Sequence, residues 1–417
     1  MTTFKEYRNE INKIFARYIH HGFVDYYSCR RLGGEMINLV VEATKELSFR
    51  GEYKELFDLV NKGFLKWSKT DKDDSDGETQ DFTYFVNKAW DVIYEANNSN
   101  ISHKKMYEWF EKHLDGSLID YMEDSIYEYI THHFTELDLL KRKFSFFNNK
   151  IVEARKDKKD YYHEFLITRC QENLLFVMAD MKKPITEIRK YALSIKSSSV
   201  KEIMAKIEYL YGNMDEVITI YEDLAAKEEN RGYPLENWHL KLMEVYKELG
   251  DSDKYKKELR AALKINVGDK ELWEDYKRYY SKEEWSRECE EIFSEIDPGD
   301  YNAYSWYEIE KRYDLMMAAL ENTFFSDKLK AYEGKLKPLY PERCITLLIK
   351  DTEKMASQAN NRKAYIRVVK NLAWIKKYPE GDKKAEELAD KFRFIYKQKS
   401  AFMEEISKFK SLLDKSN

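Results

Sequence analysis

Two pairs of adjacent histidines, His20-His21 and His132-His133, are the residues whose types best suit metal binding or proton transfer. An imidazole changes its charge near neutral pH and is the commonest metal ligand in proteins. Neighbouring residues on a helix point about 100° apart, so one such pair cannot hold a single metal ion well. We therefore predict histidines on helix surfaces and no metal site. A site built from His20, His132 and His163 across several helices is the open alternative.

Four cysteines could act as nucleophiles or as metal ligands, but they are far apart in the sequence and form no CxxC pair. Zinc sites and redox pairs depend on such close spacing. Two of the cysteines fall within apolar helical patterns, which predicts thiols in a hydrophobic core. The four are Cys29, Cys170, Cys289 and Cys344, and the two in apolar patterns are Cys170 and Cys344.

Other patterns that bind cofactors are incomplete. Gly33-Gly34 is a lone doublet without the GxGxxG or GxxxxGK context of a nucleotide site. The acidic segment Lys69–Gln80 reads as a mobile loop, and it lacks the alternating ligands and closing glutamate of a calcium loop. Carboxylates are so abundant that a pair of them is no evidence for acid–base catalysis. We therefore expect no cofactor, no catalytic residue and a protein that is not an enzyme.

The charge balance and the absence of long apolar runs limit the class of partner. The chain has 71 basic and 76 acidic side chains, a net charge of -5, and no basic stripe, which makes nucleic acid an unlikely partner. No apolar run approaches the roughly 18 residues needed to cross a bilayer. The opening residues MTTFKEYRNEINK do not resemble a signal peptide. We expect a cytoplasmic protein with reduced thiols and no membrane partner.

Aromatic residues are the remaining oddity, with 32 Tyr, 22 Phe and 8 Trp. Most of them should fill the gaps between paired helices. Some could instead line a concave groove and bind a partner peptide, because Tyr and Trp dominate interface hot spots. Nearby acids such as Asp275 and Asp300 argue against single-stranded nucleic acid. The candidate partner-binding residues are Trp238, Tyr246, Tyr276, Tyr279, Tyr280, Tyr304 and Trp306.

The elements that must position these residues are helices. The chain has only 14 Gly and 6 Pro, and the first proline is Pro184, which suits helices joined by short turns. Apolar residues at spacings of three and four, such as Ile11, Ile14, Phe15 and Ile19, give one buried stripe per helix. We predict an all-α protein of about twenty helices.

The stretch YLYGNMDEVITIYEDL, from Tyr209 to Leu224, reads as a helix end, a glycine turn and a second helix. A similar unit has its turn at Gly250, and Gly212 and Gly250 lie 38 residues apart (250 − 212), close to the period of about 34 residues of tetratricopeptide repeats. Tyr255 stands where that repeat usually has alanine. The prediction is an irregular α-solenoid of antiparallel helical hairpins, similar to tetratricopeptide repeats.

Composition and proline positions divide the chain into three predicted parts. Residues 1–183 should form an N-terminal array of helical hairpins, and 184–296 should form the degenerate tetratricopeptide-like repeats. The motif DPGD, from Asp297 to Asp300, marks the next break, so 297–417 should form C-terminal helical hairpins.

Both ends of the chain resemble the helical region that follows the zinc finger in bacterial SWIM-type zinc-finger proteins. The resemblance rests on GFVDY and RGEYKELFDLV near the start, and on YPERCITLLIKDTEKMASQANNRKAYIRVVKNLAWIKKY and FRFIYKQKSAFMEEISKF near the end. It implies a bacterial protein with a helical scaffold. The finger's Cys-x-Cys and Cys-x-His ligands are absent, so its metal site cannot be carried over. The resemblance then implies a helical scaffold that either stands alone or receives its finger from another chain.

Together these features predict a non-enzymatic helical-repeat scaffold that binds a protein or peptide partner in its central repeats. One alternative is a peptide-responsive regulator, in which the N-terminal helices act on a partner while the repeats sense a ligand. The other alternative is a nucleic-acid-associated factor related to SWIM zinc-finger proteins.

Overall fold

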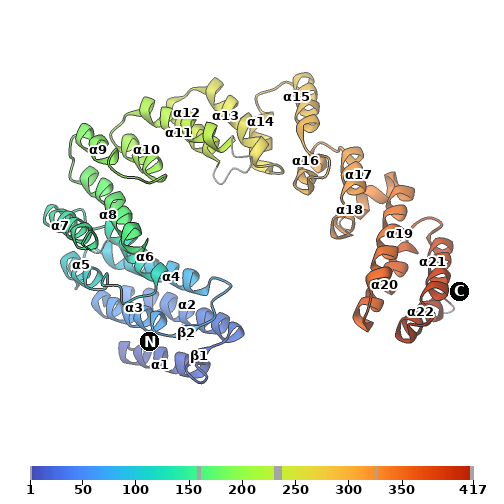
Figure 1. The fold of residues 1–417 in the computed structure, drawn as a ribbon, viewed down its shortest axis with the longest axis horizontal. Helices are drawn as coiled ribbons and strands as arrows, with labels where there is room; N and C mark the ends of the chain where they lie inside the picture. Colours follow the sequence, from blue (N-terminus) through green and yellow to red (C-terminus); the bar gives the residue numbers. More distant parts are fainter. Residues whose placement is uncertain (1, 157–160, 230–236, 325, 414–417) are drawn as a thin grey trace. The chain divides into compact units, whose positions relative to one another are not determined.

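The computed structural model describes residues 2–156, 161–229, 237–324 and 326–413 of the chain (Figure 1). Within these ranges the chain is almost entirely helical, with 22 α-helices, one short 3-10 helix and two strands of two residues each. The all-α prediction is confirmed. None of the described helices is long and apolar enough to cross a membrane. The chain divides into two compact units, Met1–Ile220 and Tyr221–Asn417.

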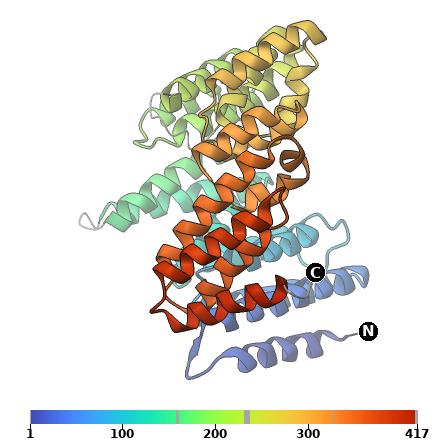
Figure 2. The ribbon, with the colours of Figure 1, turned by 90° about the vertical axis from the view of Figure 1, so that its right-hand side faces the viewer.

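Among its described residues, unit 1 contains ten helices and the two short strands, and helix α11 crosses from it into unit 2. Helices α1 to α4 lie side by side, and α7 packs along α8 (Figures 1 and 2). The elements are α1 Phe4–Tyr18, β1 Phe23–Val24, α2 Tyr26–Phe49, α3 Tyr53–Ser68, β2 Asp71–Lys72, α4 Glu78–Tyr94, α5 His103–Lys112, α6 Asp120–His132, α7 Leu137–Ala154, α8 Tyr161–Asp180, α9 Ile185–Ala192, α10 Val200–Leu210 and α11 Met214–Glu229.

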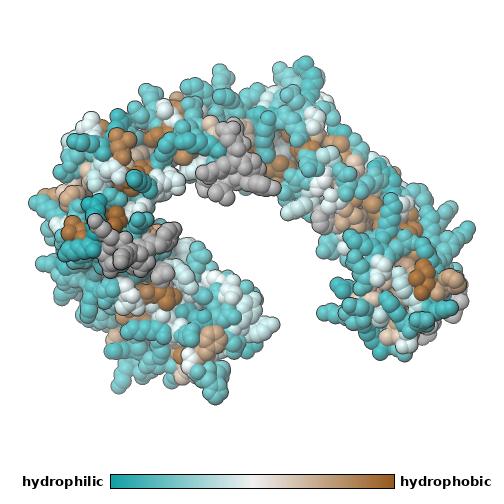
Figure 3. All heavy atoms as spheres, viewed as in Figure 1, coloured by the Kyte–Doolittle hydropathy of each residue, from teal (hydrophilic) through white to brown (hydrophobic). Residues whose placement is uncertain are grey.

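Unit 2 contains the remaining helices, and along most of its length each helix packs against the next one in the chain. The face shown in Figure 3 is mostly hydrophilic in both units, in keeping with the high content of charged residues. Its elements are α12 Trp238–Leu249, α13 Ser252–Ile265, α14 Lys270–Lys277, α15 Lys282–Glu295, η1 Tyr301–Ala303, α16 Tyr304–Ile309, α17 Tyr313–Asn322, α18 Ser326–Leu339, α19 Pro341–Gln358, α20 Arg362–Ile375, α21 Gly381–Ile395 and α22 Ser400–Leu413.

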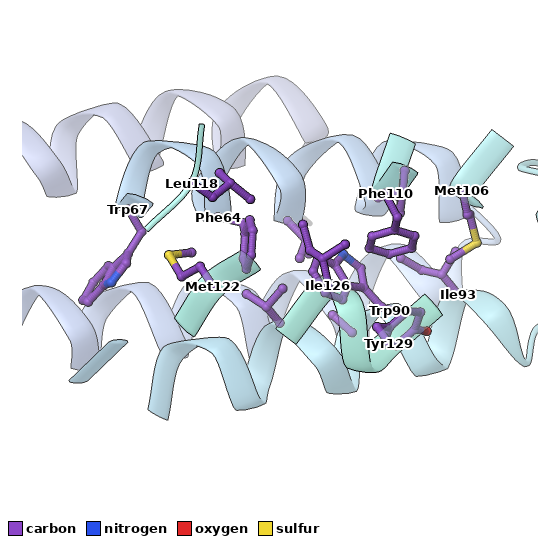
Figure 4. Close-up of a cluster of buried hydrophobic side chains, with 14 of the residues drawn as sticks. Phe64, Trp67, Trp90, Ile93, Met106, Phe110, Leu118, Met122, Ile126 and Tyr129 are labelled. Atoms are coloured by element: carbon purple, nitrogen blue, oxygen red, sulfur yellow. The ribbon is translucent and has the colours of Figure 1, made fainter. Parts of the chain in front are cut away.

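Aromatic side chains fill the core of unit 1 where α3, α4, α5 and α6 meet (Figure 4). Trp90 packs edge-on against Phe110 with ring centroids 4.7 Å apart, and Phe64 lies 5.3 Å from the same indole. A buried indole needs a partner for its N–H group. Trp90 donates to Asn61 Oδ1 at 2.9 Å, and Trp67 donates to Thr79 Oγ1 at 2.8 Å. The rings therefore bury a large apolar area without leaving these donors unsatisfied.

The acidic segment after α3 is more ordered than the sequence suggests. Strands β1 and β2 pair in parallel, and the N–H group of Asp73 donates to the carbonyl of Val24 at 2.9 Å. Gly77 has a φ of 88°, which allows the chain to turn directly into α4 at Glu78. The sequence predicted a mobile loop for Lys69–Gln80 because the two-residue strands β1 and β2 are too short to show an apolar pattern of their own.

The predicted three-part division stays a prediction, and apolar cores continue across both of its boundaries. A cluster of buried residues joins Met178 of α8 to Ile188 of α9 and Ile203 of α10, so the core continues across position 184. Another core joins Phe293 of α15 to Tyr304 of α16 and continues across position 297. Proline and glycine mark turns at these positions, but the helices on either side share apolar faces.

Lys143 is a buried charge at the junction of α6 and α7. Its ammonium group donates to the carbonyls of Thr131 and His133, at 3.2 and 2.7 Å, and so satisfies the end of α6. Burial lowers the pKa of Lys143 from 10.5 to about 8, although Asp180 and Glu136 act in the opposite direction.

The lowered pKa makes the stability of unit 1 depend on pH. Between about pH 8 and pH 10.5 the unfolded chain binds more protons at Lys143 than the folded chain does, so raising the pH favours folding. Relative to Lys143→Met, the wild type should gain about 2 kcal/mol in unfolding free energy between pH 7 and pH 9.5. Urea denaturation at both pH values, followed by circular dichroism, measures this difference. Lys150→Met, at a half-buried position on the same helix, is the control, and an equal gain relative to both variants would contradict the assignment.

Candidate functional site

The turn between α12 and α13 places several tyrosines around one hollow in unit 2. Gly250 ends α12 with a φ of 70°, a left-handed conformation that glycine adopts without strain. The carboxylate of Asp251 then accepts the N–H group of Lys254 at 3.1 Å and starts α13. The two helices therefore run antiparallel, and α13 packs in turn against α14.

The hollow has a volume of about 250 Å³ and is lined by residues from α12, α13, α14 and the intervening turn. Its walls combine aromatic rings with carboxylates and one lysine. The lining residues are Tyr246, Lys247, Gly250, Asp251, Ser252, Tyr255, Asp275 and Tyr279.

Hydrogen bonds fix the tyrosines in place. Tyr255 donates its hydroxyl hydrogen to Asp275 Oδ2 at 2.6 Å, which ties α13 to α14. Burial and this carboxylate both raise the pKa of Tyr255. Tyr246 donates to Glu222 at 3.4 Å, and burial raises its pKa to about 12. These phenols therefore stay protonated at neutral pH and act as hydrogen-bond donors.

Lysines lie close to the aromatic rings around the hollow. The ammonium nitrogen of Lys254 is 5.2 Å from the centroid of the Tyr246 ring, and that of Lys256 is 5.9 Å from the centroid of the Tyr279 ring. Such cation–π contacts hold flexible lysine side chains near an aromatic surface. The site can offer apolar ring faces, carboxylate acceptors and ammonium donors to the same ligand.

Five of the seven aromatic residues selected from the sequence are buried, and two are half-buried. Trp238, Tyr246, Tyr276, Tyr304 and Trp306 are at most 9% exposed, whereas Tyr279 and Tyr280 are partly accessible. Tyr246 and Tyr279 line the hollow, and Trp306 lines a second hollow of about 530 Å³ beside Arg260. Most of this set therefore builds the hairpin core, and its members do not converge on one surface.

The buried rings pack tightly between α14, α15 and α16. Trp273 stacks on Trp306 with ring centroids 4.4 Å apart, and Trp306 donates its indole hydrogen to the carbonyl of Asp269 at 2.7 Å. Tyr276 donates to Glu288 at 2.9 Å, and burial raises the pKa of Tyr276. These residues hold the helices that shape the hollow.

Sequence reasoning missed two residues that define the hollow, Asp275 and Ser252. Tyr255 carried a usable signal, because a tyrosine stands there where the repeat pattern has a small residue. A ring at that position keeps the helices apart and needs a partner for its hydroxyl group. Asp275 was noted only as an acid that disfavours nucleic acid, because its pairing with Tyr255 depends on the packing of α13 against α14.

The histidines and cysteines do not converge on a reactive centre. No group of three or more His, Cys, Asp or Glu side chains suited to a metal ion occurs within the described ranges, so His20, His132 and His163 do not form one. Burial lowers the pKa of His132. All four cysteines are buried, and burial raises the pKa of Cys29, Cys170 and Cys289 to about 12 and that of Cys344 to about 11. Their thiols are therefore protonated and weakly nucleophilic at neutral pH.

Comparison with known proteins finds no family model that matches the chain and no curated protein that matches it. The resemblance of both chain ends to the helical region of SWIM-type zinc-finger proteins therefore stays a prediction. Function must be inferred from the geometry and charge of the surfaces described above.

Gly268 controls the packing of the loop before α14. Its φ is 90°, and a Cβ atom there would lie 2.2 Å from the carbonyl oxygen of Asn302. Ser305 also donates to the carbonyl of Gly268 at 2.6 Å. The backbone of this loop thus touches η1 directly, which brings Trp306 onto Trp273.

Gly268→Ala should destabilise unit 2 by about 3 kcal/mol or more, because the methyl group both strains the backbone and displaces Asn302. Gly250→Ala is the matched control: its φ is also positive, but its Cβ would meet nothing within 4 Å, so it should cost only about 1 kcal/mol. Urea denaturation followed by near-ultraviolet circular dichroism compares the two. Equal losses would show that the contact with Asn302 is unimportant.

Proposed function

We propose that this chain is a helical scaffold that binds a segment of a protein or peptide partner at the hollow between α12, α13 and α14, and that it carries out no chemistry of its own. The observation that carries this proposal is the convergence of Tyr246, Tyr255 and Tyr279 with Asp275 around one accessible hollow. Rigid tyrosines are effective binding residues because they offer a large surface at a small cost in conformational entropy.

The size of the hollow favours a peptide side chain over a small molecule. Small-molecule sites usually have volumes of about 300–1,000 Å³ and enclose most of their ligand. A hollow of about 250 Å³ suits one or two side chains of a longer segment whose remainder lies on the helix surface. Asp275 and Lys247 at its rim provide polar contacts that would fix the direction of the bound chain.

The proposal includes an irregular α-solenoid, in which the hairpins of unit 2 stack in series as in tetratricopeptide repeats. Packing of α12 on α13, α13 on α14, α14 on α16 and α16 on α17 supports such a stack. The left-handed glycine at position 250, in the turn between α12 and α13, also fits it. A serial stack would expose successive turns along one edge, and the hollow includes one such turn, at Gly250 and Asp251.

A cytoplasmic location is part of this proposal. There are two alternative functions, and the kind of molecule bound to the purified protein distinguishes them. A peptide-responsive regulator would carry a short peptide, and a factor related to SWIM zinc-finger proteins would carry nucleic acid or a chain that supplies the finger. The tyrosine hollow favours the first two functions over the third, because its lining has two carboxylates and one lysine.

Filling the hollow should remove the partner without unfolding the protein. Ser252 is exposed at the start of α13 and lines the hollow, so Ser252→Trp places a large ring there. Affinity purification from the cell of origin should recover at least tenfold less of the partner with this variant than with wild type. Phe394→Ala, which removes an aromatic side chain that is 80% exposed elsewhere in unit 2, should recover it fully.

The outcome also separates the alternatives. Recovery of a protein partner with wild type but not with Ser252→Trp supports the scaffold. Recovery of a short peptide supports the regulator. Nucleic acid whose binding falls steeply with salt supports the third function. Equal recovery of the same partner by Ser252→Trp and wild type would rule out the hollow as the binding site.

A further inference from the structure

A separate groove lies in unit 1, where one polar face of α4 meets one polar face of α6. Its volume is about 710 Å³, and the segment 74–79 closes one end. Both helices contribute residues with the spacing i, i+3, i+4 and i+7, which places each set on a single helix face. These residues are Gln80, Thr83, Tyr84 and Asn87 of α4, and Tyr121, Asp124, Ser125 and Glu128 of α6.

The walls of this α4–α6 groove are held in place by the fold. Ser125 donates to Asn87 Oδ1 at 3.0 Å and so connects the two helices below the groove. At the closed end, Thr79 donates its hydroxyl hydrogen to Asp74, and its own oxygen accepts from Trp67 of the core at 2.8 Å. The groove is therefore built on the aromatic core of unit 1 and does not depend on a loose surface loop.

The charge of the groove is one-sided. Three carboxylates line it, on Asp74, Asp124 and Glu128, whereas no lysine or arginine is among the lining residues. Arg169 forms an ion pair with Asp124 at 2.5 Å, and its positive charge compensates the negative charge of this one carboxylate. His132 interacts with Glu128 and is held neutral by burial, which lowers its pKa. Lys72 interacts with Asp74 from outside the lining. Asp74 and Glu128 therefore face the groove without a lysine or arginine among the residues that line it.

Thr83 provides an independent sign that the groove takes a polar ligand. Its side chain lines the groove and is only 8% exposed, yet Oγ1 has no hydrogen-bond partner in the described part of the chain. A buried hydroxyl group that makes no hydrogen bond costs free energy relative to one that does. A hydrogen-bonding ligand in the groove would remove that cost.

Two tyrosines form the apolar part of the same groove. Tyr84 and Tyr121 are each 56% exposed, so a large part of each ring is accessible to a ligand. Lys88 already lies over Tyr84, with its ammonium nitrogen 5.6 Å from the ring centroid, so this ring accepts a cation. An arginine or lysine side chain would find ring faces and carboxylates together.

We propose that the α4–α6 groove binds a basic segment of a protein partner, with an arginine or lysine side chain placed against Tyr84 and Tyr121 and paired with Glu128 and Asp74. Charge complementarity selects this occupant. A neutral sugar also suits tyrosines and amides, but it gains nothing from two carboxylates that lack a cation in the groove. The groove belongs to unit 1, so this proposal is independent of the tyrosine hollow in unit 2.

Fluorescence anisotropy on the full chain tests the proposal with three labelled peptides that differ only at two positions: Gly-Arg-Gly-Arg-Gly, the same peptide with citrulline for arginine, and the same with glutamate. The arginine peptide should bind, and its affinity should fall as salt is added. The citrulline and glutamate peptides should bind at least tenfold more weakly. Equal binding of the citrulline peptide, or displacement of the arginine peptide by maltotriose, would overturn the proposal.

Variants then locate the binding. Glu128 is exposed, so Glu128→Gln should leave the fold intact and weaken the arginine peptide about fivefold, and Glu128→Lys should weaken it further. Thr83→Val should weaken binding while the melting temperature stays equal or rises, because it removes an unpaired buried hydroxyl group.

The control is Glu42→Gln, which replaces an exposed glutamate in the separate groove beside α1 and α2 and should leave binding unchanged. Unchanged binding by both Glu128 variants would refute the site, whereas Ser252→Trp should bind the arginine peptide as wild type does.

Discussion

The packing of large aromatic rings between neighbouring helices is the constraint on which both units depend. A helix with one apolar stripe is stable only when another helix covers that stripe, and rings such as Trp90 and Trp273 fill the space between the helix backbones. In each unit some of these rings also have partners for their polar atoms. Trp90 donates to Asn61, and Trp306 donates to the carbonyl of Asp269. The rings thus fix the distances between helices as well as burying surface.

This use of the aromatics explains where binding surfaces can form. Many rings are committed to the core, and the accessible ones include rings at helix ends and on polar helix faces. Tyr279 follows the end of α14 and lies in the hollow beside Asp275. Tyr84 lies on a polar face of α4, in the α4–α6 groove. Each accessible ring lies beside carboxylates, so both sites combine an apolar face with charge and differ mainly in whether a lysine is part of the lining.

The candidate site was only partly predictable. The sequence indicated which segments are rich in tyrosine, but burial separates Tyr276 and Tyr304, which lie in the core, from Tyr279, which reaches the surface. Tyr276 and Tyr304 lie on α14 and α16, whereas Tyr279 lies in the turn after α14, so the point at which the helix ends decides which ring reaches the surface. Pro184 and the DPGD motif mark turns, but they give no information on whether the helices on either side share a core, as they do here.

Residue spacing by itself determined the secondary structure of this protein. Apolar residues three and four apart, few prolines, and glycines at turns such as Gly212 and Gly250 specify helices and their ends through local backbone preferences. The tertiary structure alone decided which faces meet. The pairing of β1 with β2, the contact of Gly268 with Asn302, and the groove between α4 and α6 all join residues that are distant in sequence. Such contacts depend on how whole helices pack, and no local pattern records that arrangement.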